Sequence, residues 1–202
     1  MRVSPSASVK RLRWRVVDIV VASVIAVACA FVFLVWNLAY EVPSAVLTPL
    51  LPGLQGLVAG PWLIAGVLGG LVVRKPGAAL YTELVAATVS ALVGAQWGPL
   101  TMVSGLTQGL GAELVFLVFW YAVWRLPVAV LAGAGAGLAC GITDRVLWYP
   151  GVDTLFTVVY LATTTLSGAA IAGVGGWCAM RGLAATGALG RFAAGRDVAR
   201  RV

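Results

Sequence analysis

Positive charge falls on one side of this chain if its long apolar segments cross a membrane in alternating directions. Thirteen of the fourteen lysines and arginines lie at the two termini or in the connections near residues 75 and 125. Only Arg145 lies in a connection of the opposite parity. Because positively charged loops resist translocation, this distribution predicts six spans with both termini in the cytoplasm.

The composition excludes a water-soluble domain. Of the 202 residues, 61% are hydrophobic and 10% are charged, whereas a soluble domain carries about a quarter charged residues. We expect an all-α membrane protein, a single compact bundle of six transmembrane helices at about residues 16–37, 56–73, 78–94, 108–124, 128–142 and 154–180. Residues 1–15 are expected to form a basic cytoplasmic arm, 16–181 the membrane domain, and 182–202 an Arg-rich cytoplasmic tail.

Several kinds of chemistry lack the residues that they require. The sequence has no histidine, which excludes HExxH zinc sites and Ser-His-Asp triads. The three cysteines are far apart in apolar segments, so we expect no metal, no cofactor and no enzyme activity. No GxxxxGK motif followed by Ser or Thr is present, so any ATP hydrolysis requires another subunit. The net charge of +7 lies at helix ends and tails, which indicates contact with lipid rather than nucleic acid.

Two glutamates fall within predicted spans that contain no lysine or arginine at the same depth. Glu83 lies near the middle of the span 78–94, and Glu113 lies about one and a half turns below the outer end of the span 108–124. Charge at membrane depth is costly, so each glutamate must be protonated, hydrogen-bonded to neutral donors, or paired with a cationic ligand. We favour ligand contact for Glu113 and weigh ligand contact and structural bonding equally for Glu83.

Two aspartates are expected at helix ends. Asp18 begins the first span beside Arg15, where a carboxylate stabilises a helix N-terminus. Asp144 ends the fifth span next to Arg145. For Asp144 we expect an ion pair with Arg145 or a role in the loop.

Polar and aromatic residues near the outer side complete the predicted ligand site. Gln108 lies five residues before Glu113, among glycines that allow a ligand to approach closely. Trp97 is the best aromatic candidate, because a flat heterocycle can stack on its ring. An aromatic belt at the membrane surface is the alternative explanation for the outer aromatic residues. The candidate ligand-binding residues are Glu113, Gln108, Trp97, Glu83, Gln96, Trp36 and Tyr40.

A strip of small residues runs along the first predicted helix. Ala22, Ala26 and Ala30 are four residues apart, so they share one helix face. Small residues at this spacing allow another helix to approach closely. That helix could belong to another subunit or to the same bundle.

Four segments resemble the YkoE family, the substrate-binding S components of energy-coupling factor (ECF) transporters for hydroxymethylpyrimidine. They are residues 14–20 (WRVVDIV), 74–83 (RKPGAALYTE), 96–99 (QWGP) and 105–116 (GLTQGLGAELVF), within a resemblance over about residues 14–180. The resemblance implies a six-helix protein of a bacterial plasma membrane that binds hydroxymethylpyrimidine, thiamine or a related compound from outside. It also implies docking on a transmembrane coupling subunit with two ATPases, with Ala22, Ala26 and Ala30 as the contact.

A stand-alone carrier is the main alternative to this importer subunit. Glu83 and Glu113 could act as proton sites in a secondary transporter of a small cationic or heterocyclic solute. Many such carriers contain inverted repeats, and the sequence has no convincing internal repeat. We therefore favour the importer subunit, with a small-molecule substrate, the lipid bilayer, the coupling subunit and the ATPases as its partners.

Overall fold

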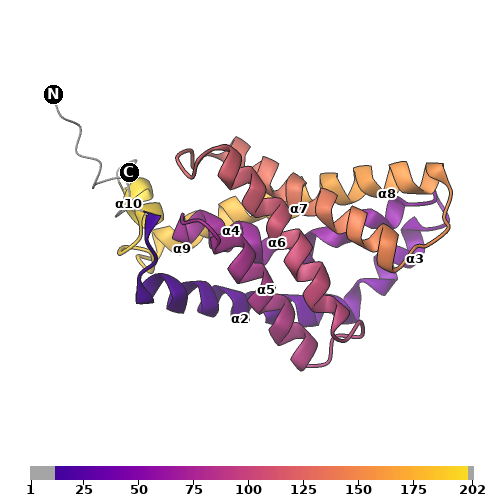
Figure 1. Ribbon diagram of the computed structural model, residues 1–202, viewed down its shortest axis with the longest axis horizontal. Coiled ribbons are helices and arrows are strands. Elements are labelled where there is room, and N and C mark those ends of the chain that lie inside the picture. Colours follow the sequence, from indigo (N-terminus) through magenta and orange to yellow (C-terminus); the bar gives the residue numbers. More distant parts are fainter. Residues whose placement is uncertain (1–11, 200–202) are drawn as a thin grey trace.

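The computed structural model describes residues 12–199, which fold into helices without any strand. In chain order these are α2 (Val16–Ala39), α3 (Glu41–Leu47), the 3₁₀ segment η1 (Leu54–Leu63), α4 (Ile64–Val73), α5 (Ala78–Leu92), α6 (Leu100–Val118), α7 (Leu126–Leu147), α8 (Thr154–Ser167), the π-helical segment η2 (Gly168–Gly175), α9 (Gly176–Ala185) and α10 (Ala193–Ala199). Figure 1 shows α2 and α8 running roughly along the long axis of a single bundle, with α5 and α6 crossing that axis obliquely. The expected basic arm lies largely outside the described residues.

Within the described part of the chain, five segments are long and apolar enough to cross a membrane. They are Val16–Ala39, Leu54–Val73, Leu100–Val118, Leu126–Leu147 and Thr154–Ala185. The remaining long helix, α5, is apolar but has only 15 residues. The protein is therefore a multi-pass membrane protein made of helices, as the sequence predicts.

The connections between helices gather at two opposite ends of the bundle (Figure 1). One end, called here the basic end, consists of residues 12–15, the α4–α5 turn, the α6–α7 connection and residues 186–199. Contacts between distant segments hold it together: Trp14 Nε1 donates to the Pro76 carbonyl at 2.8 Å, and Arg74 pairs with Asp197 at 2.5 Å. The opposite end contains α3 and the loops 93–99 and 148–153. It is called here the cavity end, after the cavity described below.

Pro61 shapes the second span. A proline has no N–H and its ring clashes with the preceding turn, so it interrupts an α-helix. The interruption takes the form of the 3₁₀ segment η1, which contains Pro61 and leads directly into α4. The first N–H groups of α4 consequently need acceptors from outside their own helix.

Glycines allow α6 and α7 to touch through their backbones. A Cβ atom on Gly135 would lie 2.6 Å from the carbonyl oxygen of Gly111, closer than real Cβ atoms approach. This agrees with the close packing that the glycine-rich sequence of α7 predicts.

Helix α6 differs most from the sequence prediction. It was expected at residues 108–124, but it begins at Leu100 and ends at Val118. Pro99 immediately precedes the helix, and a proline is compatible with a helix start because its missing N–H is not needed there. The helix stops because Trp120 and Tyr121 adopt left-handed backbone conformations, with φ of 52° and 53°. This shift places Glu113 near the basic end of α6, so its expected position near the outer end was wrong.

Glu113 binds the start of α5. Its carboxylate accepts hydrogen bonds from the N–H groups of Gly77 (2.6 Å), Ala79 (2.9 Å) and Leu80 (3.3 Å), and from the Tyr121 hydroxyl (2.6 Å). Burial and then the bond to Glu113 raise the pKa of the Tyr121 phenol, so it stays protonated and donates. Both oxygens of the Glu113 carboxylate therefore already accept hydrogen bonds from the protein. The helix dipole of α5 also favours a negative charge at this position.

The alanine strip of α2 faces the interior of the bundle. Ala22 and Ala26 have no exposed surface, and Ala30 is 3% exposed. The strip lies where α2 packs on α4 and α5, and Ala22 clusters with Val73 and Ala78. The small side chains allow close approach by helices of the same chain, and contact of the strip with a coupling subunit stays a prediction.

Replacing Ala26 with tryptophan should destabilise the whole bundle. Overpacking a filled interior costs about 1–3 kcal/mol or more, so the Tm in detergent should fall and ligand binding should fall with it. Ala28→Trp is the matched control, because Ala28 is exposed on the same helix. Equal Tm values for the two variants would show that the strip is exposed on the protein surface rather than packed inside the bundle.

Replacing Glu113 with glutamine should lower stability. The introduced amide would turn its own N–H donors toward backbone N–H groups, and each unsatisfied buried donor costs about 1–3 kcal/mol. We expect a lower Tm in detergent for Glu113→Gln and an unchanged Tm for Glu41→Gln, which alters an exposed glutamate of α3. A Tm equal to that of the wild type would show that the cap of α5 does not stabilise the bundle.

Candidate ligand-binding site

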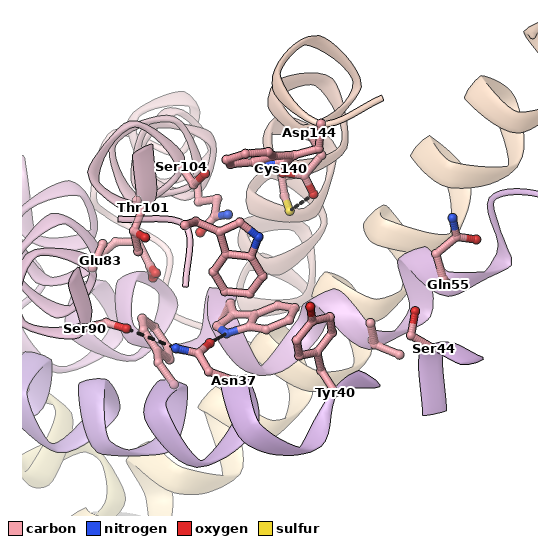
Figure 2. Close-up of a pocket in the computed structure, with 18 of the residues that line it drawn as sticks. Asn37, Tyr40, Ser44, Gln55, Glu83, Ser90, Thr101, Ser104, Cys140 and Asp144 are labelled. Atoms are coloured by element: carbon pink, nitrogen blue, oxygen red, sulfur yellow. Dashed lines mark hydrogen bonds between the residues drawn. The ribbon is translucent and has the colours of Figure 1, made fainter. Parts of the chain in front are cut away.

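A cavity of about 320 Å³ lies at the cavity end, between α2, η1 and the helices α5 to α8 (Figure 2). This volume is in the range of small-molecule sites. Its polar and aromatic lining includes Asn37, Tyr40, Ser44, Gln55, Trp62, Glu83, Ser90, Trp97, Thr101, Ser104, Gln108, Cys140, Asp144, Trp148, Tyr149 and Tyr160.

Unpartnered polar atoms concentrate in this cavity. In the described part of the chain, three buried side-chain atoms have no hydrogen-bond partner: Gln55 Oε1, Glu83 Oε1 and Thr101 Oγ1. All three residues line the cavity. Buried polar atoms in folded proteins are nearly always hydrogen-bonded. Three such atoms around one cavity indicate that a polar ligand or water completes their bonding.

Glu83 lies on one wall of the cavity, on α5 (Figure 2). Its Oε2 atom accepts a hydrogen bond from the N–H of Gly66 at 2.5 Å, in the first turn of α4. That N–H lacks a partner in its own helix because α4 starts just after the Pro61 interruption. One carboxyl oxygen of Glu83 therefore caps α4, and the other is buried without a hydrogen-bond partner. Glu113, by contrast, has donors on both oxygens.

Asn37 and Trp62 form a second part of the polar wall. Trp62 Nε1 donates to Asn37 Oδ1 at 2.7 Å, and Asn37 Nδ2 donates to Ser90 Oγ at 3.5 Å. These bonds connect α2, η1 and α5 across the cavity. They hold the Trp62 ring in a fixed orientation at the edge of the ligand space.

Aromatic rings form two groups around the cavity. The ring centroid of Trp62 lies 5.2 Å from Tyr40 and 5.3 Å from Trp97. In the second group, Tyr149 and Tyr160 have ring centroids 5.1 Å apart. Rings at these distances support one another by edge and tilted contacts, and their faces can hold a flat heterocycle.

Asp144 and Arg145 do not form the expected ion pair. Asp144 lies in α7, which is longer than predicted, and its Oδ2 accepts from the Tyr160 hydroxyl at 2.8 Å and from Cys140 Sγ at 3.3 Å. Arg145 instead donates to the carbonyls of Tyr149 at 2.6 Å and Val152 at 3.2 Å. Arg145 thus organises the 148–153 loop, and Asp144 is left to face the cavity.

The charges at the cavity favour a cation or a ligand rich in hydrogen-bond donors. Two carboxyl groups, Glu83 and Asp144, belong to the lining, and the described lining residues include no lysine or arginine. An anionic ligand would find no charged partner here. A protonated ring, a quaternary nitrogen or an amino group would find carboxyl oxygens on two walls.

The structure brings together four of the seven predicted ligand residues: Glu83, Gln108, Trp97 and Tyr40 line the cavity. Two others do not line the cavity but donate hydrogen bonds to residues that do. Gln96 donates to the Tyr40 hydroxyl at 2.6 Å, and Trp36 donates to the Val58 carbonyl at 2.9 Å. Glu113 is not part of the lining.

Several residues that line the cavity were not predicted from the sequence. Asn37, Gln55, Trp62 and Tyr160 were not among the candidates, although all four line the cavity. Amides inside apolar segments are the signal that could have identified Asn37 and Gln55, because an amide at membrane depth needs partners. Contact of any of these residues with a ligand remains a prediction.

Comparisons with known proteins agree with this architecture. Residues 17–139 match the family described as "ABC-type cobalt transport system, permease component". A Bacillus subtilis (strain 168) protein, "Putative HMP/thiamine permease protein YkoE", is 37% identical over 186 residues, which cover 92% of each chain. The Escherichia coli (strain K12) "Glucuronide carrier protein homolog" is 33% identical over 101 residues, only 44% of this chain and 21% of that protein.

A solved structure has the same fold. It is a crystal structure of an S component of an ECF transporter, with a TM-score of 0.84 and 35% identity, and the match covers 94% of this chain and 95% of that one. The helices, the cavity and these matches lead to one conclusion. The chain belongs to the YkoE family of ECF S components, which are membrane transport subunits and not enzymes.

Proposed function

We propose that this subunit captures hydroxymethylpyrimidine, thiamine or a related thiamine precursor from outside the cell for an ATP-driven ECF importer. The observation that carries the proposal is the cavity lined by Glu83, Gln55 and Thr101, each of which has a buried side-chain oxygen without a hydrogen-bond partner. The relative from Bacillus subtilis, whose name includes HMP and thiamine, supports the choice of substrate class.

The chemistry of an aminopyrimidine suits this lining. The exocyclic amino group would donate to Glu83 Oε1, the one oxygen of that carboxyl group without a partner. A hydroxymethyl group would donate to the Gln55 amide oxygen, and the Thr101 hydroxyl can donate to a ring nitrogen. The rings of Tyr40, Trp62 and Trp97 would enclose the flat heterocycle. In thiamine, the second, positively charged ring would be stabilised by the cavity's carboxyl groups.

The proposed topology has six spans, with the basic end in the cytoplasm and the cavity end outside. Arg74, Lys75 and Arg125 would then lie inside, in accordance with the preference of positive loops for the cytoplasm. Helix α5 would be the sixth span. Its 15 residues correspond to about 22 Å, less than the roughly 30 Å of a bilayer core. Glu113 compensates by satisfying the backbone donors at the start of α5 below the membrane surface.

Energy for transport would come from partner proteins. The sequence has no P-loop, so a coupling subunit and two ATPases are proposed as partners. The alternative, a proton-coupled carrier, relied on Glu83 and Glu113 as two proton sites. Four donors already bind Glu113, which weakens that alternative.

Glu83→Gln should weaken binding of hydroxymethylpyrimidine and thiamine. Loss of one hydrogen bond to the ligand costs about 0.5–3 kcal/mol, or roughly two- to a hundredfold in Kd. Calorimetry on the purified protein checks this, with Glu41→Gln as the control because Glu41 lies outside the cavity. Unchanged affinity in Glu83→Gln would show that the ligand does not depend on Glu83 of α5. Mass spectrometry of the purified protein should find the same class of compound bound.

Uptake should require the partners. In proteoliposomes, this chain with a coupling subunit and two ATPases should accumulate labelled thiamine or hydroxymethylpyrimidine only when ATP is present. The chain alone, under an imposed pH gradient, should bind the compound without accumulating it. Accumulation by the chain alone would establish the proton-coupled carrier instead.

A further inference from the structure

A second cavity, of about 390 Å³, lies at the basic end and shares no lining residue with the ligand-binding cavity. The described residues that line it include four cations, Arg15, Arg74, Lys75 and Arg196, and one carboxylate, Asp197. The cations come from three separate parts of the chain: the start of α2, the α4–α5 turn and α10. Nothing in the proposed transport of a vitamin precursor uses this cavity.

Two of the guanidinium groups are held in place by aromatic rings and hydrogen bonds. Arg74 lies over the Trp124 ring at 5.3 Å, and its Nε donates to the Leu71 carbonyl at 3.1 Å. Arg15 lies over the Phe192 ring at 5.8 Å. A guanidinium presents five N–H donors in a rigid fork, so these contacts orient it in advance and reduce the freedom that it loses when an anion binds.

Asp197 shows that the cavity accepts an anionic oxygen. Its Oδ2 atom lies 2.5 Å from Arg74 Nη1, while its side chain remains 53% exposed. Asp18 is different, because it is fully buried between Arg15 and Lys75. The Arg74 side chain is only 8% exposed, but Asp197 reaches it from the solvent side, so a ligand with more charge and more acceptor oxygens can compete with Asp197 for this guanidinium.

The residues around this cavity indicate that it lies at the depth of the lipid headgroups. Trp120, in the α6–α7 connection that also supplies Tyr121 and Trp124 to the cavity, is 82% exposed. Exposed tryptophans next to arginines are typical of the membrane–water interface. In the proposed orientation this is the cytoplasmic interface, where anionic lipids and soluble phosphate esters both occur.

We propose that the cavity at the basic end binds a phosphoryl group, through Arg15, Arg74 and Arg196. The group could belong to an anionic phospholipid or to a soluble phosphate ester, since both present the same acceptor oxygens to a guanidinium fork. Binding would compete with Asp197 for Arg74 and so loosen the contact of α10 with the α4–α5 turn.

The test measures binding of two probes to the purified full-length protein: dihexanoyl-phosphatidylglycerol by native mass spectrometry, and inorganic pyrophosphate by calorimetry. Arg196→Gln should weaken binding roughly two- to fivefold, as expected for a partly solvated charge pair. Asp197→Asn should strengthen binding by a similar factor, because it removes the internal competitor. Arg181→Gln is the matched control, since Arg181 is exposed but does not line the cavity.

The two probes separate the two sources. Saturable binding of the phospholipid alone would assign the site to lipid, and saturable binding of pyrophosphate would assign it to a soluble ester. The proposal is overturned if neither probe saturates, or if Arg196→Gln and Arg181→Gln weaken binding equally, which would indicate surface charge alone. Thiamine binding to the same samples reports on the other cavity, so failure here leaves the proposed function standing.

Discussion

A carboxyl group surrounded by lipid and apolar side chains needs hydrogen-bond donors, and this bundle supplies them at the starts of neighbouring helices. Glu113 on α6 caps α5, and Glu83 on α5 caps α4. Each glutamate thereby satisfies backbone N–H groups that have no partner in their own helix. These two contacts connect α4, α5 and α6 at defined depths, and the helices around them pack with small residues between their backbones.

The two glutamates differ in their hydrogen bonding: Glu113 supports the bundle, and Glu83 is proposed to bind the ligand as well. Four donors surround Glu113, so its carboxylate is complete without a ligand. Among the described residues one donor reaches Glu83, and its second oxygen is buried without a partner beside a cavity that Gln55 and Thr101 also line. The same capping interaction therefore stabilises the bundle at one end and prepares a ligand site toward the other. The interruption at Pro61 makes this arrangement possible, because it frees the N–H of Gly66.

The two ends of the bundle have opposite character. Carboxyl groups and aromatic rings surround the cavity proposed to face outward, whereas arginines and Lys75 surround the cavity at the basic end. This polarity suits a protein that accepts a cationic or donor-rich solute from one side and meets anionic groups on the other. Burial of the alanine strip leaves bulky side chains such as Val24 and Phe31 on the surface of α2.

The sequence by itself determined the membrane class, the all-helical architecture, the segregation of positive charge along the chain and four residues of the cavity, because these follow from local composition and spacing. It also carried the resemblance to the YkoE family. Only the tertiary structure decided the role of Glu113 and of Ala26. The position of Glu113 along α6 depends on where that helix starts. The helix starts at Leu100, directly after Pro99 and eight residues earlier than expected. A strip of small residues is equally suited to a neighbouring helix and to a partner subunit, and only packing shows which one covers it.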